Sequence, residues 1–493
     1  MTAWPKCPAI YEINTWVWLA ELSQTLAKPI DLSCVPAEAW DDIAKFGFDA
    51  VWLMGVWERS AAGIAIANRN ESLLADFRRA LPDFRLEDNV GSPYCVRNYV
   101  VDKSLGGPKG LAIARRELAK RGMKLLLDFV PNHVAPDHPW GREHPDYFIR
   151  GEAEDAKRDP ATFCTIRGKV FACGKDPYFP AWPDVLQLNA FEPGLRKAGI
   201  ETVSNIASQC DGIRCDMAML LLNEIFERTW GSRAGVRPAT EYWTEVIPRI
   251  KQGYPEFLFI AETYWDLEWE LQQKGFDFCY DKKLYDRLEL GNAESIRLHL
   301  CAELGYQEKL VRFIENHDEP RAAATFSPAK ERAAALMVST LPGAKLLHEG
   351  QFEGKKTRLP VFLVRRPQEA VDAGLRDFYE SLLKAVDRPL FRDSEWNLFE
   401  RTGWADNASF ENVVAWGWKK GEERFAIVIN FSENKVQARV KIPWEELRPK
   451  AWRLQDVLSG AIYDRDGNEM VDAGLYVELE GWGYHFLRCA EMA

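Results

Sequence analysis

The stretch "DGIRCDMAML" at residues 211–220 combines the pattern of a buried β-strand with two charged residues. Alternate residues of a strand point to the same side, so Arg214 and Asp216 face the same way. Charges in an apolar strand are costly unless they are paired. Two interpretations are open at this point: a structural ion pair, or a catalytic carboxylate that a neighbouring guanidinium keeps ionised.

Runs of the same kind recur along the chain and alternate with longer amphipathic stretches. The expected strands are residues 9–14, 49–54, 124–130, 211–217, 257–263, 276–281, 310–316 and 344–350. The expected helices lie near residues 37–46, 107–121, 193–208, 240–252, 267–274, 293–304, 328–340 and 372–386. Eight strand–helix alternations predict an α/β fold of the (β/α)8 type, the TIM barrel. A doubly wound open sheet is the structural alternative, but it usually has a glycine-rich loop after its first strand, and "YEINTWVW" has no glycine there.

The alternation is interrupted in two places. Residues 134–190 are rich in Pro, Asp, His and aromatic residues, which predicts a short inserted loop domain after the third strand. Beyond residue 388 the segments alternate in the manner of strands, with turns such as "DRDGN", which predicts a C-terminal antiparallel β-sandwich over residues 389–493. The barrel is therefore expected to comprise residues 1–133 and 191–388.

Composition narrows the class of protein. The 493 residues carry 63 basic and 74 acidic side chains, a net charge of −11, without a basic run. Nucleic acid is therefore not an expected partner, because phosphate binding needs clustered Lys and Arg. No apolar stretch approaches the ~20 residues of a membrane span, and the first residues lack a secretory pattern, so we expect a cytoplasmic protein without a membrane partner. The ten cysteines are scattered singly, which favours reduced thiols.

Polar residues follow four of the expected strands, at the barrel end where active sites of this fold lie. They are Asp128, Asn132 and His133 after the third strand, Arg214 and Asp216 on the fourth, Glu262 on the fifth, and Asn316, His317, Asp318 and Arg321 after the seventh. Each alone has a structural explanation, such as capping a turn or opening a helix. Together they predict that Asp216, Glu262 and Asp318 converge on one mouth of the barrel.

Four blocks carry a family resemblance: "DFVPNH" (128–133), "GIRCDMA" (212–218), "IAET" (260–263) and "ENHD" (315–318). In their order, residue identities and approximate spacing they resemble the signature regions of the α-amylase superfamily of retaining glycosidases. The likeness spans roughly residues 9–390. The four blocks together are highly specific, although any one of them alone is a weak match.

The resemblance implies a role for each residue of the blocks. Asp216 would be the nucleophile, Glu262 the general acid and then base, and Asp318 the third carboxylate, which binds sugar hydroxyls. His133, His317 and Arg214 would line the subsite of the reacting glucose, with Tyr94 stacked beneath its ring. Asp128 would orient its neighbours, and Arg321 would grip a non-reducing sugar end. Retaining chemistry needs two carboxyl groups about 5–5.5 Å apart, in environments that separate their proton affinities.

The sequence also departs from the family pattern. Many relatives carry a Lys-His pair three and four residues after the nucleophile, where this chain has Met219 and Leu220, so the leaving-group side is expected to be unusual. Asn132 matches a calcium-ligating position, but calcium takes six to eight oxygen ligands and only one can be named here. We therefore expect no cofactor, with calcium near Asn132 as the alternative. His138 and His144 lie among prolines, which favours loop packing over a metal site.

The leading hypothesis is an enzyme that hydrolyses α-glucosidic bonds in an oligosaccharide or α-glucan substrate through a covalent glycosyl-enzyme intermediate. A transglycosidase or sugar isomerase with the same three carboxylates is the alternative, because another hydroxyl or the departing sugar can attack the intermediate instead of water. A non-catalytic carbohydrate-binding or scaffold barrel is a third possibility, although such relatives typically lose carboxylates that are all present here. The sequence leaves substrate, linkage and oligomeric state open.

Overall fold

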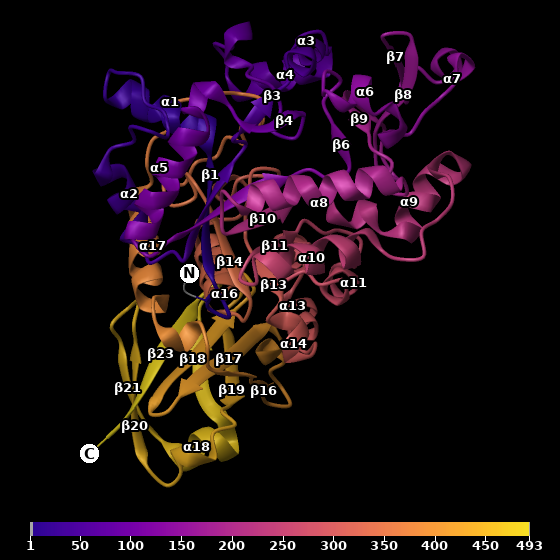
Figure 1. The fold of residues 1–493 in the computed structure, drawn as a ribbon. Helices are drawn as coiled ribbons and strands as arrows, with labels where there is room; N and C mark the ends of the chain where they lie inside the picture. Colours follow the sequence, from indigo (N-terminus) through magenta and orange to yellow (C-terminus); the bar gives the residue numbers. More distant parts are fainter. Residues whose placement is uncertain (1–2, 493) are drawn as a thin grey trace. The chain divides into compact units, whose positions relative to one another are not determined.

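The computed structural model describes residues 3–492, and its central feature is a closed barrel of eight parallel strands (Figure 1). In barrel order the strands are β1 (Ala9–Asn14), β14 (Ala344–His348), β13 (Leu310–Arg312), β12 (Phe278–Tyr280), β11 (Leu258–Ala261), β10 (Gly212–Cys215), β5 (Lys124–Phe129) and β2 (Ala50–Met54). Each strand lies where the sequence pattern predicts it. The predicted (β/α)8 barrel is confirmed.

The barrel strands are short apolar runs because both of their faces are covered. Every residue of β2, β10 and β11 is buried. Gly212 marks the tightest approach in β10, because a Cβ atom there would lie 2.7 Å from side-chain atoms of both Leu126 on β5 and Leu258 on β11. The glycine of the quoted stretch is therefore a packing requirement of the barrel.

The expected helices are also present. They are α2 (Ala37–Ala44), α5 (Gly107–Lys120), α8 (Pro193–Ala207), α10 (Tyr242–Gly253), α11 (Glu268–Gln273), α13 (Ala293–Leu300), α16 (Pro328–Thr340) and α17 (Ala373–Val386). In α5, Leu111, Ala114 and Leu118 are buried at the three- and four-residue spacing of an amphipathic helix. Further helices lie outside the predicted ones, namely α1 (Thr15–Thr25), α3 (Ala61–Ala67), α4 (Glu71–Ala80), α9 (Asn223–Trp230) and α12 (Lys282–Leu290).

The segment after β5 contains a small antiparallel sheet. Its strands, in the order β6-β9-β8-β7, are β6 (His133–Val134), β9 (Trp182–Gln187), β8 (Lys169–Gly174) and β7 (Phe163–Ile166), and α6 (Trp140–Glu143) and α7 (Ala153–Arg158) belong to the same segment (Figure 1). Val134, Phe148, Phe171 and Leu186 contribute to its own hydrophobic cluster. The predicted inserted loop domain thus has a sheet and a hydrophobic core of its own. Its boundaries at residues 134 and 190 stay a prediction.

The C-terminal region is built from two antiparallel sheets. One has the order β15-β17-β18-β23-β20-β21 and the other the order β16-β19-β22. Their strands are β15 (Glu395–Leu398), β16 (Glu400–Thr402), β17 (Val413–Lys420), β18 (Glu423–Asn430), β19 (Val436–Lys441), β20 (Ala451–Asp456), β21 (Ile462–Asp466), β22 (Leu475–Leu479) and β23 (Tyr484–Glu491). One core contains Val428 and Leu487 from the first sheet and Val440 and Val477 from the second. This arrangement confirms the predicted sandwich.

Contacts divide the described chain into two compact units. One contains residues 10–280 and 357–368, and the other contains residues 4–9, 281–356 and 369–492. The strands that carry Asp128, Arg214 and Glu262 belong to the first unit, and the strand that precedes Asp318 belongs to the second. Within residues 3–492, no helix combines the length and the apolar character that crossing a membrane requires.

Candidate active site

The charges of the quoted stretch form a buried ion pair at the end of β10. Nη1 of Arg214 lies 2.7 Å from Oδ1 of Asp216, and both side chains are buried. Arg214 lies directly opposite Asp128 of β5 in the strand register. The position of Arg214 inside the barrel is therefore fixed by backbone pairing, and Asp216 follows at the strand's carboxyl end.

The same guanidinium also contacts Glu262. Nη2 of Arg214 lies 2.7 Å from Oε2 of Glu262, which follows the neighbouring strand β11. Pairing between the two strands continues past their ends, because Glu262 N–H donates to the Cys215 carbonyl (3.0 Å) and Ala218 N–H donates to the Glu262 carbonyl (3.1 Å). Two carboxyl groups from adjacent strands thus share one buried arginine.

The turn after Asp216 is strained and faces Glu262. Met217 has a φ of 44°, in the left-handed region, which costs a non-glycine residue about 1–2 kcal/mol. In this conformation Met217 N–H donates to Oε2 of Glu262 at 2.6 Å. The hydroxyl of Tyr264 donates to Oε1 at 2.9 Å. Tyr264 is not among the predicted site residues, although its spacing of two from Glu262 is the signal that would have identified it.

Aromatic rings surround the shared arginine. The Arg214 guanidinium lies 5.0 Å from the ring centroid of Tyr94, 5.6 Å from that of Trp52 and 5.9 Å from that of Tyr280. Burial lowers the pKa of Arg214, but the charges of Glu262, Tyr94 and Asp216 outweigh it and raise this pKa well above its ordinary value. Arg214 is therefore a permanent cation at the centre of the site.

Asp128 lies near the end of β5 and His133 begins β6, both in the first unit. Oδ2 of Asp128 accepts a hydrogen bond from Gly55 N–H at 2.8 Å, and its carbonyl accepts from Nε1 of Trp57 at 2.8 Å. These bonds tie β5 to the segment after β2. Burial lowers the pKa of His133 to about 4, so its imidazole is neutral at neutral pH.

Asn132 does not present a cation site. Gln187 is fully buried, and its Nε2 donates to Oδ1 of Asn132 (2.9 Å), to the Asn132 carbonyl (3.0 Å) and to the Leu188 carbonyl (2.9 Å). An amide N–H group is therefore bound to Oδ1 of Asn132, the oxygen that would be the calcium ligand. The residues around Asn132 do not fit calcium.

The two histidines of the inserted segment are engaged in packing contacts. Nδ1 of His138 accepts from Trp140 N–H at 3.2 Å, and the ring of His144 is stacked on that of Tyr147 with centroids 4.6 Å apart. Burial lowers the pKa of His138 to about 4. Across residues 3–492, no group of three or more His, Cys, Asp or Glu side chains is arranged to hold a metal ion.

In the second unit, the loop after β13 holds the remaining predicted residues. Nε2 of His317 lies 3.0 Å from Oδ2 of Asp318, whose side chain is partly exposed. Asn316 orders this loop, because its Oδ1 accepts from the N–H groups of Asp318 and Glu319, both at 2.9 Å. Asp318 therefore follows a barrel strand in a fixed loop.

Arg321 of the same loop is buried in a polar network. Its Nη1 contacts Glu315, lies 2.8 Å from Nδ1 of His348 and donates to the Glu349 carbonyl at 2.9 Å. These contacts stabilise the ends of β13 and β14. The predicted role of Arg321 in gripping a sugar end stays a prediction.

Two further features of the first unit concern buried side chains. Met219 and Leu220, which replace the family's Lys-His pair, are both buried in the core. Arg59, near Tyr94, is also buried, and its guanidinium lies 5.1 Å from the ring of Trp16. Among the described residues, Nε and Nη2 of Arg59 have no hydrogen-bond partner, and burial lowers the pKa of Arg59 to about 9.

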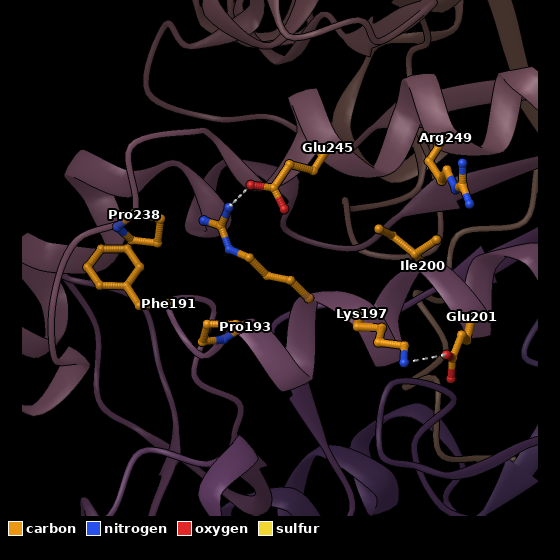
Figure 2. Close-up of a pocket in the computed structure, with 9 residues that line it drawn as sticks. Phe191, Pro193, Lys197, Ile200, Glu201, Pro238, Glu245 and Arg249 are labelled. Carbon is orange, nitrogen blue, oxygen red and sulfur yellow. Dashed lines mark hydrogen bonds and ion pairs between the residues drawn. The ribbon is translucent and has the colours of Figure 1, made fainter.

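A separate cavity of about 430 Å³ is lined by residues of α8 and α10 (Figure 2). It contains none of the predicted site residues. Its main polar element is Arg196, which lies 2.7 Å from Glu245 and donates to the carbonyls of Ala190 and Thr240. Since these bonds join α8 to the chain around α10, we interpret Arg196 as a packing residue.

Comparison with known proteins supports the resemblance in the signature blocks. Residues 37–275 match the family model described as alpha amylase, catalytic domain. The alpha-amylase MalA of Haloarcula japonica is 25% identical over 438 residues, which cover 87% of this chain and 56% of that protein. The alpha-1,4-glucan:maltose-1-phosphate maltosyltransferase of Rhodospirillum rubrum is 24% identical over 240 residues, covering 45% of this chain and 27% of that protein.

The chain thus spans about half, or less, of the length of these curated relatives. A crystal structure of the noncanonic maltogenic alpha-amylase AmyB from Thermotoga neapolitana has the same fold, with a TM-score of 0.68, 18% identity and coverage of 98% of both chains. The family model covers residues 37–275, so this part of the chain belongs to the alpha-amylase catalytic-domain family, and the closed barrel agrees with that assignment.

Proposed function

We propose that this protein hydrolyses α-glucosidic bonds in oligosaccharides or α-glucans with retention of anomeric configuration. The observation that carries the proposal is the guanidinium of Arg214, which contacts Asp216 and Glu262 at 2.7 Å each. Two carboxyl groups on one guanidinium fit the short separation of retaining glycosidases, about 5–5.5 Å, better than the ~6.5–9.5 Å of inverting enzymes.

In the first half-reaction, an oxygen of Asp216 forms a bond to the anomeric carbon while the bond to the glycosidic oxygen breaks. Glu262 gives its proton to that oxygen, and the leaving sugar departs. In the second half-reaction, Glu262 takes a proton from water, the water oxygen attacks the anomeric carbon, and Asp216 is released as a carboxylate. One water molecule is consumed for each bond that is broken.

The shared contact with Arg214 keeps the charge of the two carboxyl groups balanced during the reaction. Before attack, the negative charge of the pair lies on Asp216 and Glu262 holds the proton. In the covalent intermediate, Asp216 is a neutral ester and the charge lies on Glu262. The negative charge therefore passes from the carboxylate beside Nη1 of Arg214 to the carboxylate beside Nη2. It stays next to the guanidinium cation, so the buried site remains balanced through both half-reactions.

The other residues take the roles that the family resemblance implies. We propose Asp318 as the carboxylate that binds sugar hydroxyls, with His133 and His317 as further hydrogen-bonding groups and Tyr94 as the ring beneath the reacting sugar. Asp128 acts by positioning Gly55 and Trp57 through the bonds described above. We also propose that the enzyme works in the cytoplasm and without bound calcium.

Transfer to a sugar acceptor is the second candidate. The maltosyltransferase named above matches part of this chain, and transfer proceeds through the same covalent intermediate, with a sugar hydroxyl in place of water. Incubation of the protein with maltopentaose and a labelled maltose acceptor distinguishes the two functions. A hydrolase releases mainly shorter unlabelled sugars, whereas a transferase mainly forms labelled products that are longer than maltose.

The proposal is tested by following maltodextrin turnover with ¹H NMR. Retention requires that the α-anomer of the new reducing end appears first and converts to the β-anomer by mutarotation. The variant Asp216→Asn should abolish turnover and leave the thermal unfolding midpoint within a few degrees. First appearance of the β-anomer, or turnover by Asp216→Asn, would show that the assignment of the nucleophile is wrong.

A further inference from the structure

A cavity of about 780 Å³ lies between α3 and the inserted segment, and none of the predicted site residues lines it. Its apolar wall comes from Ile66 of α3, Ile166 of β7, Phe171 of β8 and Leu186 of β9 (Figure 1). Helix α3 packs against β9, so the walls of the cavity are held together within the first unit. Cavities of this size bind small organic ligands.

The polar lining of this cavity is positive, although the protein is acidic. Its basic side chains are Arg97, Arg142, Arg167 and Lys169, and its acidic ones are Asp137 and Glu143. The lining thus has an excess of two positive charges, whereas the whole chain has a net charge of −11. A concave surface lined with an excess of one sign of charge attracts ligands of the opposite sign. The cavity is therefore suited to an anion.

Two of the four cations have no partner of their own. The other two are held in the ion pairs Arg142–Glu143 (2.5 Å) and Arg97–Glu58 (2.8 Å). Arg167, in the turn between β7 and β8, and Lys169, at the start of β8, form no ion pair within the part of the chain that the structure describes. A guanidinium and an ammonium group close together in the sequence match the two negative charges of a phosphate monoester.

A buried histidine adds a hydrogen-bond donor to the wall of the same cavity. His138 lines it and is only 7% exposed. Burial lowers the pKa of His138 to about 4, and its Nδ1 accepts from Trp140 N–H, so the neutral imidazole carries its hydrogen on Nε2. Among residues 3–492, this Nε2–H group has no hydrogen-bond partner. A buried donor without a partner is costly, and an oxygen atom of a ligand would satisfy it.

We propose that this cavity binds a small phosphorylated metabolite at a site separate from the candidate active site. The phosphate group is held by Arg167 and Lys169. The organic part of the ligand packs against the apolar wall and accepts a hydrogen bond from Nε2–H of His138. A sugar phosphate and a nucleoside monophosphate share this chemistry, since each joins a phosphate monoester to a body that has hydroxyl oxygens and an apolar face.

One strand connects this cavity to the candidate active site. Leu186 of β9 lines the cavity and pairs with Val134, and the next residue, Gln187, pairs with His133. The ring of Trp182, also on β9, lies 5.3 Å from the ring of His133. A ligand in the cavity therefore restrains β9 and, through it, His133. This connection rests on the proposed function, in which His133 contacts the sugar, and it predicts a lower KM when the cavity is filled.

Isothermal titration of the whole protein tests the site with three probes: glucose 6-phosphate, AMP and inorganic phosphate. We expect one of the two organic phosphates to bind at least about tenfold more tightly than inorganic phosphate, because its body contacts the apolar wall and His138. In Arg167→Gln/Lys169→Gln the affinity for this probe should fall at least about tenfold, because two charged contacts are lost. Tighter binding of glucose 6-phosphate identifies a sugar phosphate as the ligand, and tighter binding of AMP identifies a nucleotide.

A matched variant controls for the general effect of charge. Lys28→Gln/Lys109→Gln removes the same charge from two exposed positions outside the cavity and should bind as the wild type does. Equal losses in both double variants would overturn the site, and so would unchanged affinity in Arg167→Gln/Lys169→Gln. Inorganic phosphate that binds as tightly as the organic phosphates, or no binding of any probe at millimolar concentration, also overturns it. Arg167 and Lys169 are exposed, so their replacement should leave the thermal unfolding midpoint unchanged.

Turnover of maltopentaose tests the connection to His133. With the tighter probe at saturation, KM should fall at least about twofold in the wild type and stay unchanged in Arg167→Gln/Lys169→Gln. An unchanged KM in the wild type would overturn the connection. A higher KM in both proteins would overturn the separate site, because it would show that the probe competes in the active site. If the wild type does not turn over maltopentaose, the proposed function fails, whereas the titration still decides the cavity because it needs no turnover.

Discussion

A buried glutamate outside the signature blocks makes stability depend on pH. Glu331 lies on α16 with 3% of its surface exposed, and its Oε1 has no hydrogen-bond partner among the described residues. Burial, together with the negative charges of Glu315 and Asp372, raises the pKa of Glu331 from 4.5 to about 8. At neutral pH the folded chain therefore keeps Glu331 protonated, and Glu331→Gln mimics this neutral state at every pH.

The size of the effect follows from linkage between proton binding and folding. Between pH 4.5 and pH 8 the unfolded chain releases a proton that the folded chain retains, so the free energy of unfolding falls as pH rises. The pKa of Glu331 is about 8 in the folded chain and 4.5 in the unfolded chain. At about 1.4 kcal/mol per pH unit, this difference lowers the free energy of unfolding by at most about 5 kcal/mol. Below pH 4.5 the cost disappears, because both states are protonated.

Urea unfolding at pH 5 and pH 8 measures this effect in the wild type and in Glu331→Gln. The variant should unfold at a higher urea concentration at pH 8, by several kcal/mol in free energy, and the gap should shrink to about 1 kcal/mol at pH 5. Glu422→Gln replaces an exposed glutamate and serves as the control. If Glu331→Gln gains no more stability at pH 8 than at pH 5, Glu331 is not a buried acid that resists ionisation.

Three further predictions concern the candidate site. Glu262→Gln should lose at least about a thousandfold in turnover of maltopentaose. With maltotriosyl fluoride the same variant should accumulate a glycosyl-enzyme visible by mass spectrometry, because fluoride departs without a proton. Absence of that adduct would contradict the role of Glu262 as the acid. Arg214→Met should lower kcat for both substrates, because Asp216 and Glu262 lose their shared cation. Pre-steady-state kinetics should show that both half-reactions are slowed. An unchanged second half-reaction would contradict a role of Arg214 in balancing the negative charge on both carboxyl groups. Gln187→Ala should lower the free energy of unfolding by about 2–5 kcal/mol, because it leaves buried acceptors unpaired. Added EDTA should not change the thermal unfolding midpoint of the wild type. A large shift of this midpoint on adding EDTA would show that calcium binds.

The sequence by itself determined the barrel and the identity of the signature residues. Eight apolar runs, each followed by an amphipathic helix, are local patterns that the period of a strand or helix imposes on neighbouring residues. The pairing of Arg214 with Asp216 was visible for the same reason, because two residues on one strand share a face by geometry alone. The helices α3 and α4 escaped prediction, because both lie between β2 and β5 in addition to the one helix that the strand–helix alternation requires there.

Only the tertiary structure decided which distant groups meet. The sequence paired Arg214 with Asp216 but not with Glu262, because that contact depends on the register of β10 against β11. It likewise could not show that Gln187 donates to Oδ1 of Asn132, or that Tyr178 packs on Trp265. Contacts of this kind follow from strand pairing and loop packing across the fold, which no local periodicity encodes.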